Sequence, residues 1–152
     1  MINTGQDISE AGLENCARGY VGGDHGRHRS DPIVNPTTLI GNGDLYSSVE
    51  DLYQWEQALQ AGKIISPKSI QTVFSSHVFM EGSTKRSHGY GWFLDKQLDK
   101  RIAEYSGALR GFLSKYVRFM DDGLTIILLS NLEDQSQFCQ ICDGLIGVIF
   151  DQ

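Results

Sequence analysis

The spacing of apolar and polar residues divides the chain into a loop-rich start, two helices, a run of strands and a last helix. Residues 1–46 show no sustained apolar period, and the glycine-rich stretch 19–36, which holds Pro32 and Pro36, predicts a long surface loop. From Ser47 the period becomes helical. Ser47 and Glu50 form a capping-box signal, and the apolar residues Leu52, Trp55 and Leu59 then recur until Gly62 stops the helix.

A second helix and a series of strands follow. Ser66-Pro67 predicts a helix start, and apolar residues on one face carry this helix to an end near Val78, so that 47–79 holds two helices. Beyond it the period falls to two. The strands predicted from this period are 88–95, 101–107, 112–119 and 124–131.

A C-terminal helix closes the pattern. Asp134 or Ser136 is its predicted cap, and the helix spans 134–150 with its apolar face made by Phe138, Ile141, Cys142, Leu145 and Ile149. The predicted order is two helices, an antiparallel meander over 88–131 and one last helix. This order predicts the α+β class, with helices packed on a sheet of about four strands. At 152 residues the chain is predicted to form a single region, 1–152.

Composition narrows the range of partners. An apolar content of 40% is enough to bury a core, while a net charge of −6 argues against a nucleic-acid surface, which needs clustered Lys and Arg. The most apolar run, 124–129, is far shorter than a membrane span. We therefore expect no nucleic-acid partner and no membrane-spanning segment.

The three cysteines, Cys16, Cys139 and Cys142, offer little chemistry. The Cys139–Cys142 spacing places both thiols on one helix face, and a zinc site with His25 and His28 is one interpretation. The interpretation we favour is that these cysteines act as small apolar residues in an apolar helix. No metal and no cofactor is predicted.

The strongest local chemistry lies in the stretch EYSGALRGF, residues 104–112. Tyr105, Ser106, Gly107 and Ala108 place a hydroxyl on a strand, followed by a glycine that lets a ligand approach the backbone and the Ala108 N–H donate to it. From spacing alone, a bend shaped by Gly107 and Gly111 is the more frequent explanation. No Ser-x-x-Lys, Gly-x-Ser-x-Gly or His-Glu-x-x-His motif occurs in these residues.

Six segments in order resemble motifs of the serine β-lactamase and penicillin-binding-protein family, which includes class C β-lactamases, D-alanyl-D-alanine carboxypeptidases and related esterases. They are residues 1–5 (similar to LGM-x-x-T), 17–20 (A-x-G-Y), 43–52 (GGLYSTAEDL), 90–93 (GLGWF), 105–112 (H-S-G-x-x-x-G-F) and 128–131 (V-L-T-N). The resemblance implies an incomplete fold of this family, without its N-terminal strands and nucleophile helix.

The resemblance also implies which chemistry to expect. The family's Ser-x-x-Lys and Tyr-x-Asn motifs are not among these residues, so no nucleophile or base is assigned, and hydrolysis of a β-lactam, peptide or ester would need the complete protein. Tyr105 stands where the family has Lys or His. Tyr105, Ser106, Gly107 and Ala108 are therefore the substrate-facing candidates, with an acyl compound as the partner in the complete enzyme.

Two interpretations stay open. The first is the C-terminal region of a serine hydrolase, which the start of the chain within a motif favours; the second is a catalytically inactive module that binds or assembles through the former substrate face. The family often works in the periplasm or outside the cell, and no signal peptide is recognised in the sequence. The resemblance also implies an unpaired apolar strand at 124–130, and hence a homodimer that covers it.

Overall fold

The computed structural model describes residues 1–6, 15–23, 26–29, 40–41, 43–83, 85–109 and 111–150. Its helices and strands, in chain order, are β1 (Gly5–Gln6), β2 (Tyr20–Gly23), β3 (Gly26–Arg29), β4 (Leu45–Tyr46), α1 (Val49–Gln60), α2 (Pro67–Val73), β5 (Val78–Phe79), β6 (Ser87–His88), β7 (Phe93–Gln97), β8 (Lys100–Leu109), β9 (Phe112–Phe119), β10 (Leu124–Ser130), β11 (Leu132–Glu133) and α3 (Gln135–Ile149).

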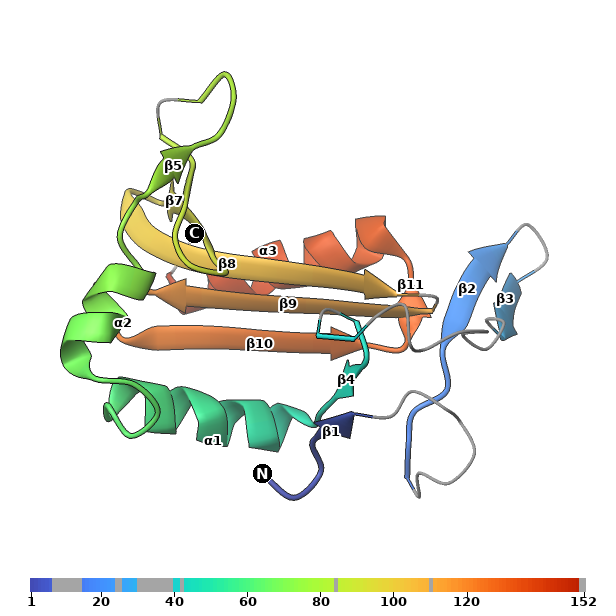
Figure 1. Ribbon diagram of the computed structural model, residues 1–152. Helices are drawn as coiled ribbons and strands as arrows, with labels where there is room; N and C mark the ends of the chain where they lie inside the picture. The colour runs from blue at the N-terminus through green and yellow to red at the C-terminus, as the bar shows by residue number, and fades with distance from the viewer. Residues whose placement is uncertain are drawn as a thin grey trace. The chain divides into compact units, whose positions relative to one another are not determined.

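An antiparallel sheet with the strand order β10-β9-β8-β7-β6-β5 is the main element of the structure (Figure 1). Three of its longer strands, β8, β9 and β10, match predicted strands, and β7 matches part of the predicted strand 88–95. The two-residue strands β5 and β6 extend the sheet at one end. The expected α+β class is confirmed. None of the described helices is long and apolar enough to cross a membrane.

Helix α1 begins one residue later than the capping-box signal suggests. Ser48 is its N-cap, and the Ser48 hydroxyl accepts a 3.2 Å hydrogen bond from the Asp51 N–H. Asp51 therefore stands at the third helical position, where the sequence analysis placed Glu50. The buried Asp51 carboxylate accepts the N–H groups of Ile2, at 3.3 Å, and Asn3, at 2.7 Å. These partners lie about fifty residues away along the chain, which is why a local motif did not identify them.

The predicted end of the second helix near Val78 is wrong. Helix α2 starts at Pro67 as expected but ends at Val73, with Phe74 as its C-cap. Val78 lies in β5 and pairs with His88 of β6. The predicted strand 88–95 is also divided, because residues 89–92 form a bend between β6 and β7. At Val78 the hydrogen bonds of a neighbouring strand override the local apolar period. At 89–92 a local turn interrupts the strand, since the Gly89 N–H donates to the Trp92 carbonyl at 2.9 Å.

The first 46 residues are not wholly loop. Strand β2 pairs with β3 in an antiparallel hairpin and with β11 in parallel, and β1 pairs with β4. The Tyr20 N–H donates to the Asn131 carbonyl at 2.9 Å, so a distant segment supplies the partner that makes β2 a strand. The rest of the predicted loop, residues 30–36, lies outside the described residues.

The chain forms two compact units, each with its own buried side chains. The first unit comprises 1–3, 47–106 and 115–127, and the second comprises 4–46, 107–114 and 128–152. The buried apolar residues of the first are Leu59, Leu94, Ile102, Ala103, Val117, Phe119 and Ile126; those of the second are Leu113, Phe138, Cys142 and Ile146. The prediction of one region over 1–152 stays a prediction.

A buried polar cluster joins α1 to β9 in the first unit. Glu56 is 1% exposed, and its carboxylate accepts hydrogen bonds from the Tyr116 hydroxyl and from Gln60 Nε2, at 2.5 Å, and pairs with Arg118 Nε at 3.0 Å. Trp55 packs edge-on against the Tyr116 ring, 6.1 Å away. Helix α1 is therefore held to the sheet by an ion pair as well as by apolar contact.

This cluster predicts a loss of stability in alkaline solution. Burial, with the hydrogen bond to the Glu56 carboxylate, raises the pKa of the Tyr116 phenol above its ordinary value of 10.0. The unfolded chain therefore loses this proton as the pH passes about 10, while the folded protein keeps it, and stability falls as the pH rises further. We expect the stability difference between the native protein and Tyr116→Phe to shrink from pH 8 to pH 11 in urea unfolding. Parallel pH profiles for the two proteins would contradict this.

Candidate functional site

The predicted substrate-facing residues lie on β8, beyond the end of its pairing with β7. The ladder between β7 and β8 runs from Gln97↔Lys100 to Phe93↔Glu104, so Tyr105, Ser106, Gly107 and Ala108 are the next residues of the strand. All four are exposed. On this side of β8, none of the described strands continues the ladder past Glu104.

The turn between β7 and β8 sets which backbone groups face that edge. Leu98 and Asp99 both have positive φ, of 52° and 58°, as in a two-residue type I′ turn, so the flanking pair Gln97↔Lys100 is hydrogen-bonded. Hydrogen-bonded pairs alternate along an antiparallel ladder, which gives Phe93↔Glu104 the same phase. The N–H and C=O groups of Ser106 and Ala108 therefore point toward the side that β7 leaves uncovered.

The two glycines of this stretch are close to atoms of the protein itself. A side-chain carbon added at Gly107 would lie 2.6 Å from the Ser114 hydroxyl oxygen, on β9. One added at Gly111 would lie 2.6 Å from the Tyr20 backbone nitrogen, and Gly111 also has a φ of +88°. Close packing within the second unit thus explains why residues 107 and 111 are glycines, without a ligand. This packing does not involve the backbone groups of Ser106 and Ala108 that face away from β9.

Tyr105 is held on its exposed site by ring contacts. The Tyr105 ring is 52% exposed and stacks on Phe93 of β7, with centroids 5.6 Å apart and planes 18° from parallel. The centroid of the His88 ring lies 4.6 Å from that of the same Phe93 ring. These contacts fix the position of the phenol beside the open edge.

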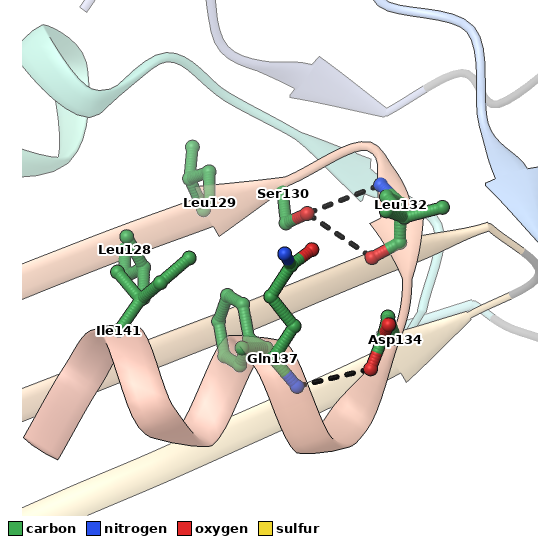
Figure 2. A pocket seen from close by; sticks show the side chains of 8 residues that line it. Leu128, Leu129, Ser130, Leu132, Asp134, Gln137 and Ile141 are labelled. Carbon is green, nitrogen blue, oxygen red and sulfur yellow. Dashed lines mark hydrogen bonds between the residues drawn. The ribbon is translucent and has the colours of Figure 1, made fainter. Parts of the chain in front are cut away.

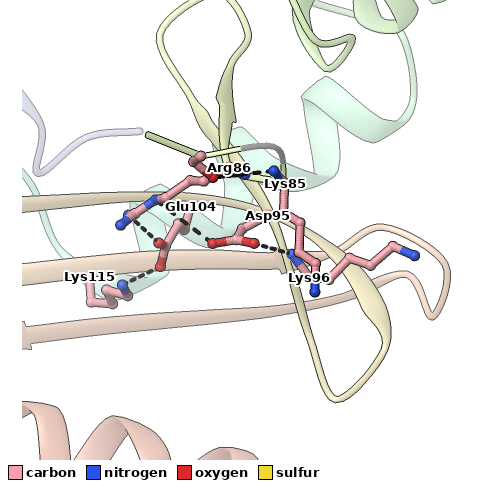
Figure 3. Close-up of polar contacts among 7 residues, drawn as sticks. Lys85, Arg86, Asp95, Lys96, Glu104 and Lys115 are labelled. Carbon is pink, nitrogen blue, oxygen red and sulfur yellow. Dashed lines mark hydrogen bonds and ion pairs between the residues drawn. The ribbon is translucent and has the colours of Figure 1, made fainter. Parts of the chain in front are cut away.

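Charged side chains gather around the residue before Tyr105. The Glu104 carboxylate forms one ion pair with the Arg86 guanidinium, at 2.8 Å, and a second with the Lys115 ammonium (Figure 3). The Arg86 Nε also lies 3.8 Å from the Asp95 carboxylate. The Glu104 side chain is 13% exposed. The positive charges of Arg86 and Lys115 are therefore balanced by the negative charges of Glu104 and Asp95 next to Tyr105.

A small cavity lies between β10 and α3 in the second unit. Its volume is about 120 Å³, and it is lined by Leu128, Leu129, Ser130, Leu132, Asp134, Gln137, Phe138 and Ile141 (Figure 2). The Ser130 hydroxyl is engaged with the backbone of Leu132, and the Asp134 carboxylate caps α3 by accepting the Gln137 N–H at 2.9 Å. The polar groups of this cavity therefore serve the turn and the helix cap.

The remaining candidates from the sequence are three cysteines and two histidines. Cys16 and Cys139 are exposed, and Cys142 is buried. His25 lies outside the described residues, and His28 lies in β3, where its side chain is not described. Among the described residues no three His, Cys, Asp or Glu side chains gather as a metal site would need.

Comparison with known proteins identifies the family. The sequence model described as Beta-lactamase matches residues 1–145, nearly the whole chain. The chain belongs to the β-lactamase family. This confirms the resemblance carried by the six segments in order.

Several members of the β-lactamase family resemble the chain over most of its length. A penicillin-binding protein of Bacillus subtilis (strain 168) is 29% identical over 95% of this chain, and a D-aminopeptidase of Brucella ovis is 24% identical over 87%. The crystal structure of a penicillin-binding protein from Bacillus halodurans superposes with a TM-score of 0.73 at 17% identity, over 94% of this chain. A D-amino acid amidase from Ochrobactrum anthropi superposes with a TM-score of 0.69 at 23% identity, over the full chain.

The chain spans only part of each of these relatives. It covers 34% of the Bacillus subtilis protein, 25% of the Brucella ovis protein, 44% of the Bacillus halodurans structure and 50% of the Ochrobactrum anthropi structure. Activities and substrates of the whole β-lactamase-family proteins therefore come to this chain only as proposals.

The local pattern assigned no role to Phe93 or Arg86. Phe93 meets Tyr105, and Arg86 meets Glu104, only through pairing between strands, at separations of up to eighteen residues. The period-two pattern predicted the strands but not their register, so it contained no signal for these contacts.

Proposed function

We propose that this chain is the substrate-side region of a β-lactamase-family serine hydrolase, with residues 105–108 lining the acyl substrate. The observation that carries the proposal is the early end of the β7–β8 ladder at Glu104, which leaves the Ser106 and Ala108 backbone groups facing an edge that no described strand covers. An extended acyl or peptide group binds such an edge by adding a strand to it. A backbone N–H there also stabilises a developing oxyanion.

The proposal assigns no nucleophile to these 152 residues. No serine is followed by lysine in the Ser-x-x-Lys spacing that the family uses. Ser106 itself lies in β8, and its neighbours Tyr105 and Gly107 carry no basic side chain that would activate it. Acyl transfer would then require a nucleophile and a base that this region of the family does not supply.

Intact-mass spectrometry tests this assignment. After incubation with a fluorophosphonate and, separately, with a reactive β-lactam, we expect the chain to keep its unmodified mass, because an unactivated serine hydroxyl is a poor nucleophile. A labelled serine hydrolase in the same buffer shows that each reagent is active. A single stable adduct mapped to Ser106 would overturn the assignment and show that the chain carries its own nucleophile.

The second candidate is an assembly module, favoured by the apolar surface near the C-terminus. β10 is the end strand of the sheet, and its sequence LTIILLS carries no charge. Leu129 is 38% exposed, and α3 exposes a further apolar row made by Ile141, Leu145, Val148 and Ile149. The apolar period predicted that Ile141, Leu145 and Ile149 belong to the buried face, but only Phe138, Cys142 and Ile146 are buried in α3.

We propose that a second copy of the chain covers this edge by antiparallel pairing of β10 with β10, since an uncharged edge strand is complementary to itself under a two-fold axis. A penicillin-binding-protein homologue from Pyrococcus abyssi, with a TM-score of 0.72 at 20% identity, is described as octameric. Leu129→Lys is expected to reduce the mass measured by light scattering from dimer to monomer. Tyr53→Lys, at an exposed position of α1, is the control that should remain dimeric. A monomer for the unsubstituted chain at every concentration would contradict the proposal.

A further inference from the structure

Three rings lie in a row across neighbouring strands of the first unit. His88 of β6 is the direct partner of Phe93 of β7, and Phe93 in turn stacks on Tyr105 of β8. We call His88, Phe93 and Tyr105 the aromatic ladder. The Arg86 guanidinium lies 5.0 Å from the Phe93 ring centroid and so holds the middle of the ladder. The ladder ends at Tyr105, which keeps half of its surface exposed.

Two cations that contact the residue next to Tyr105 are already paired. Arg86 and Lys115 both contact the Glu104 carboxylate, and Arg86 lies near Asp95 as well (Figure 3). Glu104 is largely buried, so its ion pairs are screened less than surface pairs. A ligand carboxylate placed beside Tyr105 would have to compete with Glu104 for these cations, and it would approach the Glu104 charge as well.

The backbone next to Tyr105 can bind an uncharged group. The Ser106 N–H and C=O face the edge that β7 does not reach, because they share the phase of the hydrogen-bonded Gln97↔Lys100 pair. These groups bind an amide or ester without needing a charge on it. The Tyr105 ring supplies an apolar face, and aromatic groups gain most when they meet another ring.

We infer that Tyr105 determines specificity at this edge, by selecting an uncharged acyl compound that carries an aromatic or planar group and by disfavouring one that ends in a carboxylate. This inference rests on the proposed function of residues 105–108. Phe93 acts on the ligand only through Tyr105 and is therefore a positioning residue. The Tyr105 side chain both attracts an aromatic group and disfavours a ligand carboxylate, so one residue sets which ligands bind.

A matched pair of small ligands tests the inference on the full chain. Hippuramide and hippurate share the benzoylglycine skeleton and differ in a terminal amide against a carboxylate. In a two-dimensional amide NMR titration, we expect hippuramide to shift the Ser106 amide signal with an affinity about tenfold higher than that of hippurate. Equal or tighter binding of hippurate would overturn the inference and leave the proposed function standing. No shift at Ser106 with either ligand would overturn both.

Variants separate the ring from the rest of the surface. Tyr105→Ala is expected to lower hippuramide affinity about tenfold, whereas Tyr105→Phe keeps the ring and should keep the affinity within about twofold. Tyr53→Ala removes an equally exposed tyrosine on α1 and should change nothing. Unchanged affinity in Tyr105→Ala, or a loss in Tyr105→Phe as large as in Tyr105→Ala, would overturn the role of the ring.

Discussion

Glu56→Ala is expected to destabilise the protein by about 3 to 5 kcal/mol, because it leaves Arg118 in a largely buried site without its carboxylate. The Arg118 side chain is 12% exposed, and its guanidinium already packs 4.4 Å from the Phe74 ring centroid. The Arg118 Nη1 atom is buried without a hydrogen-bond partner, so the ion pair through Nε is its main compensation. Urea unfolding of the full chain measures the loss.

Two further variants test whether the unpaired charge of Arg118 causes this loss of stability. Glu50→Ala, on the exposed side of the same helix, should cost less than about 1 kcal/mol, since it removes only a favourable charge from the first turn. Replacing both partners, as in Glu56→Leu with Arg118→Met, should recover most of the stability, because no buried charge is then left unpaired. A loss below about 1 kcal/mol for Glu56→Ala would show that water reaches Arg118 and that the cluster is not closed.

Gly111→Ala is expected to cost about 2 to 5 kcal/mol. A left-handed backbone costs a non-glycine residue about 1 to 2 kcal/mol, and overpacking adds about 1 to 3 kcal/mol. The atoms that the new methyl group would meet belong to the backbone of Gly19 and Tyr20, which cannot rotate away as a side chain can. Thermal unfolding, followed by circular dichroism, measures the change.

Gly107→Ala is the matched comparison, four residues earlier on the same stretch. Its added methyl group would meet the Ser114 hydroxyl, which can turn to another rotamer, so we expect a loss of about 1 kcal/mol or less. Equal losses at Gly107 and Gly111 would contradict the assignment of close backbone contact to Gly111 alone. The Gly107 substitution also leaves the direction of the Ser106 and Ala108 backbone groups unchanged. Comparing the two variants therefore distinguishes an effect on packing from an effect on ligand binding.

Local signals predicted those parts of the fold whose causes lie within a few residues. The Ser66-Pro67 start of α2 and the Asp134 cap of α3 follow from side chains that bond to the next turn of backbone. The strand predicted at 112–119 agrees with β9, because its alternation of apolar and polar residues matches a half-buried strand. The order of six short motifs likewise identified the family, because each motif is a run of neighbouring residues.

Local signals failed where a distant partner decides the conformation. Val78 continues an apolar helical pattern but lies in β5, because His88 offers a strand to pair with. Glycine-rich β2 is a strand because Asn131 and Leu132 supply its hydrogen bonds. Ile141 and Leu145 fit the apolar face of α3 but are exposed, since burial depends on what packs against a helix and not on its own period.

The candidate strand shows the same division. The local pattern was enough to predict that Tyr105, Ser106, Gly107 and Ala108 lie together at a strand that resembles the family's motif, since residue identity and alternation are local properties. Three features depend on contacts between strands: the β7–β8 ladder ends at Phe93↔Glu104, Tyr105 stacks on Phe93, and Arg86 and Lys115 pair with Glu104. Register, stacking and ion pairing require atoms from separate strands to meet, and their energies depend on distances that a linear pattern does not contain.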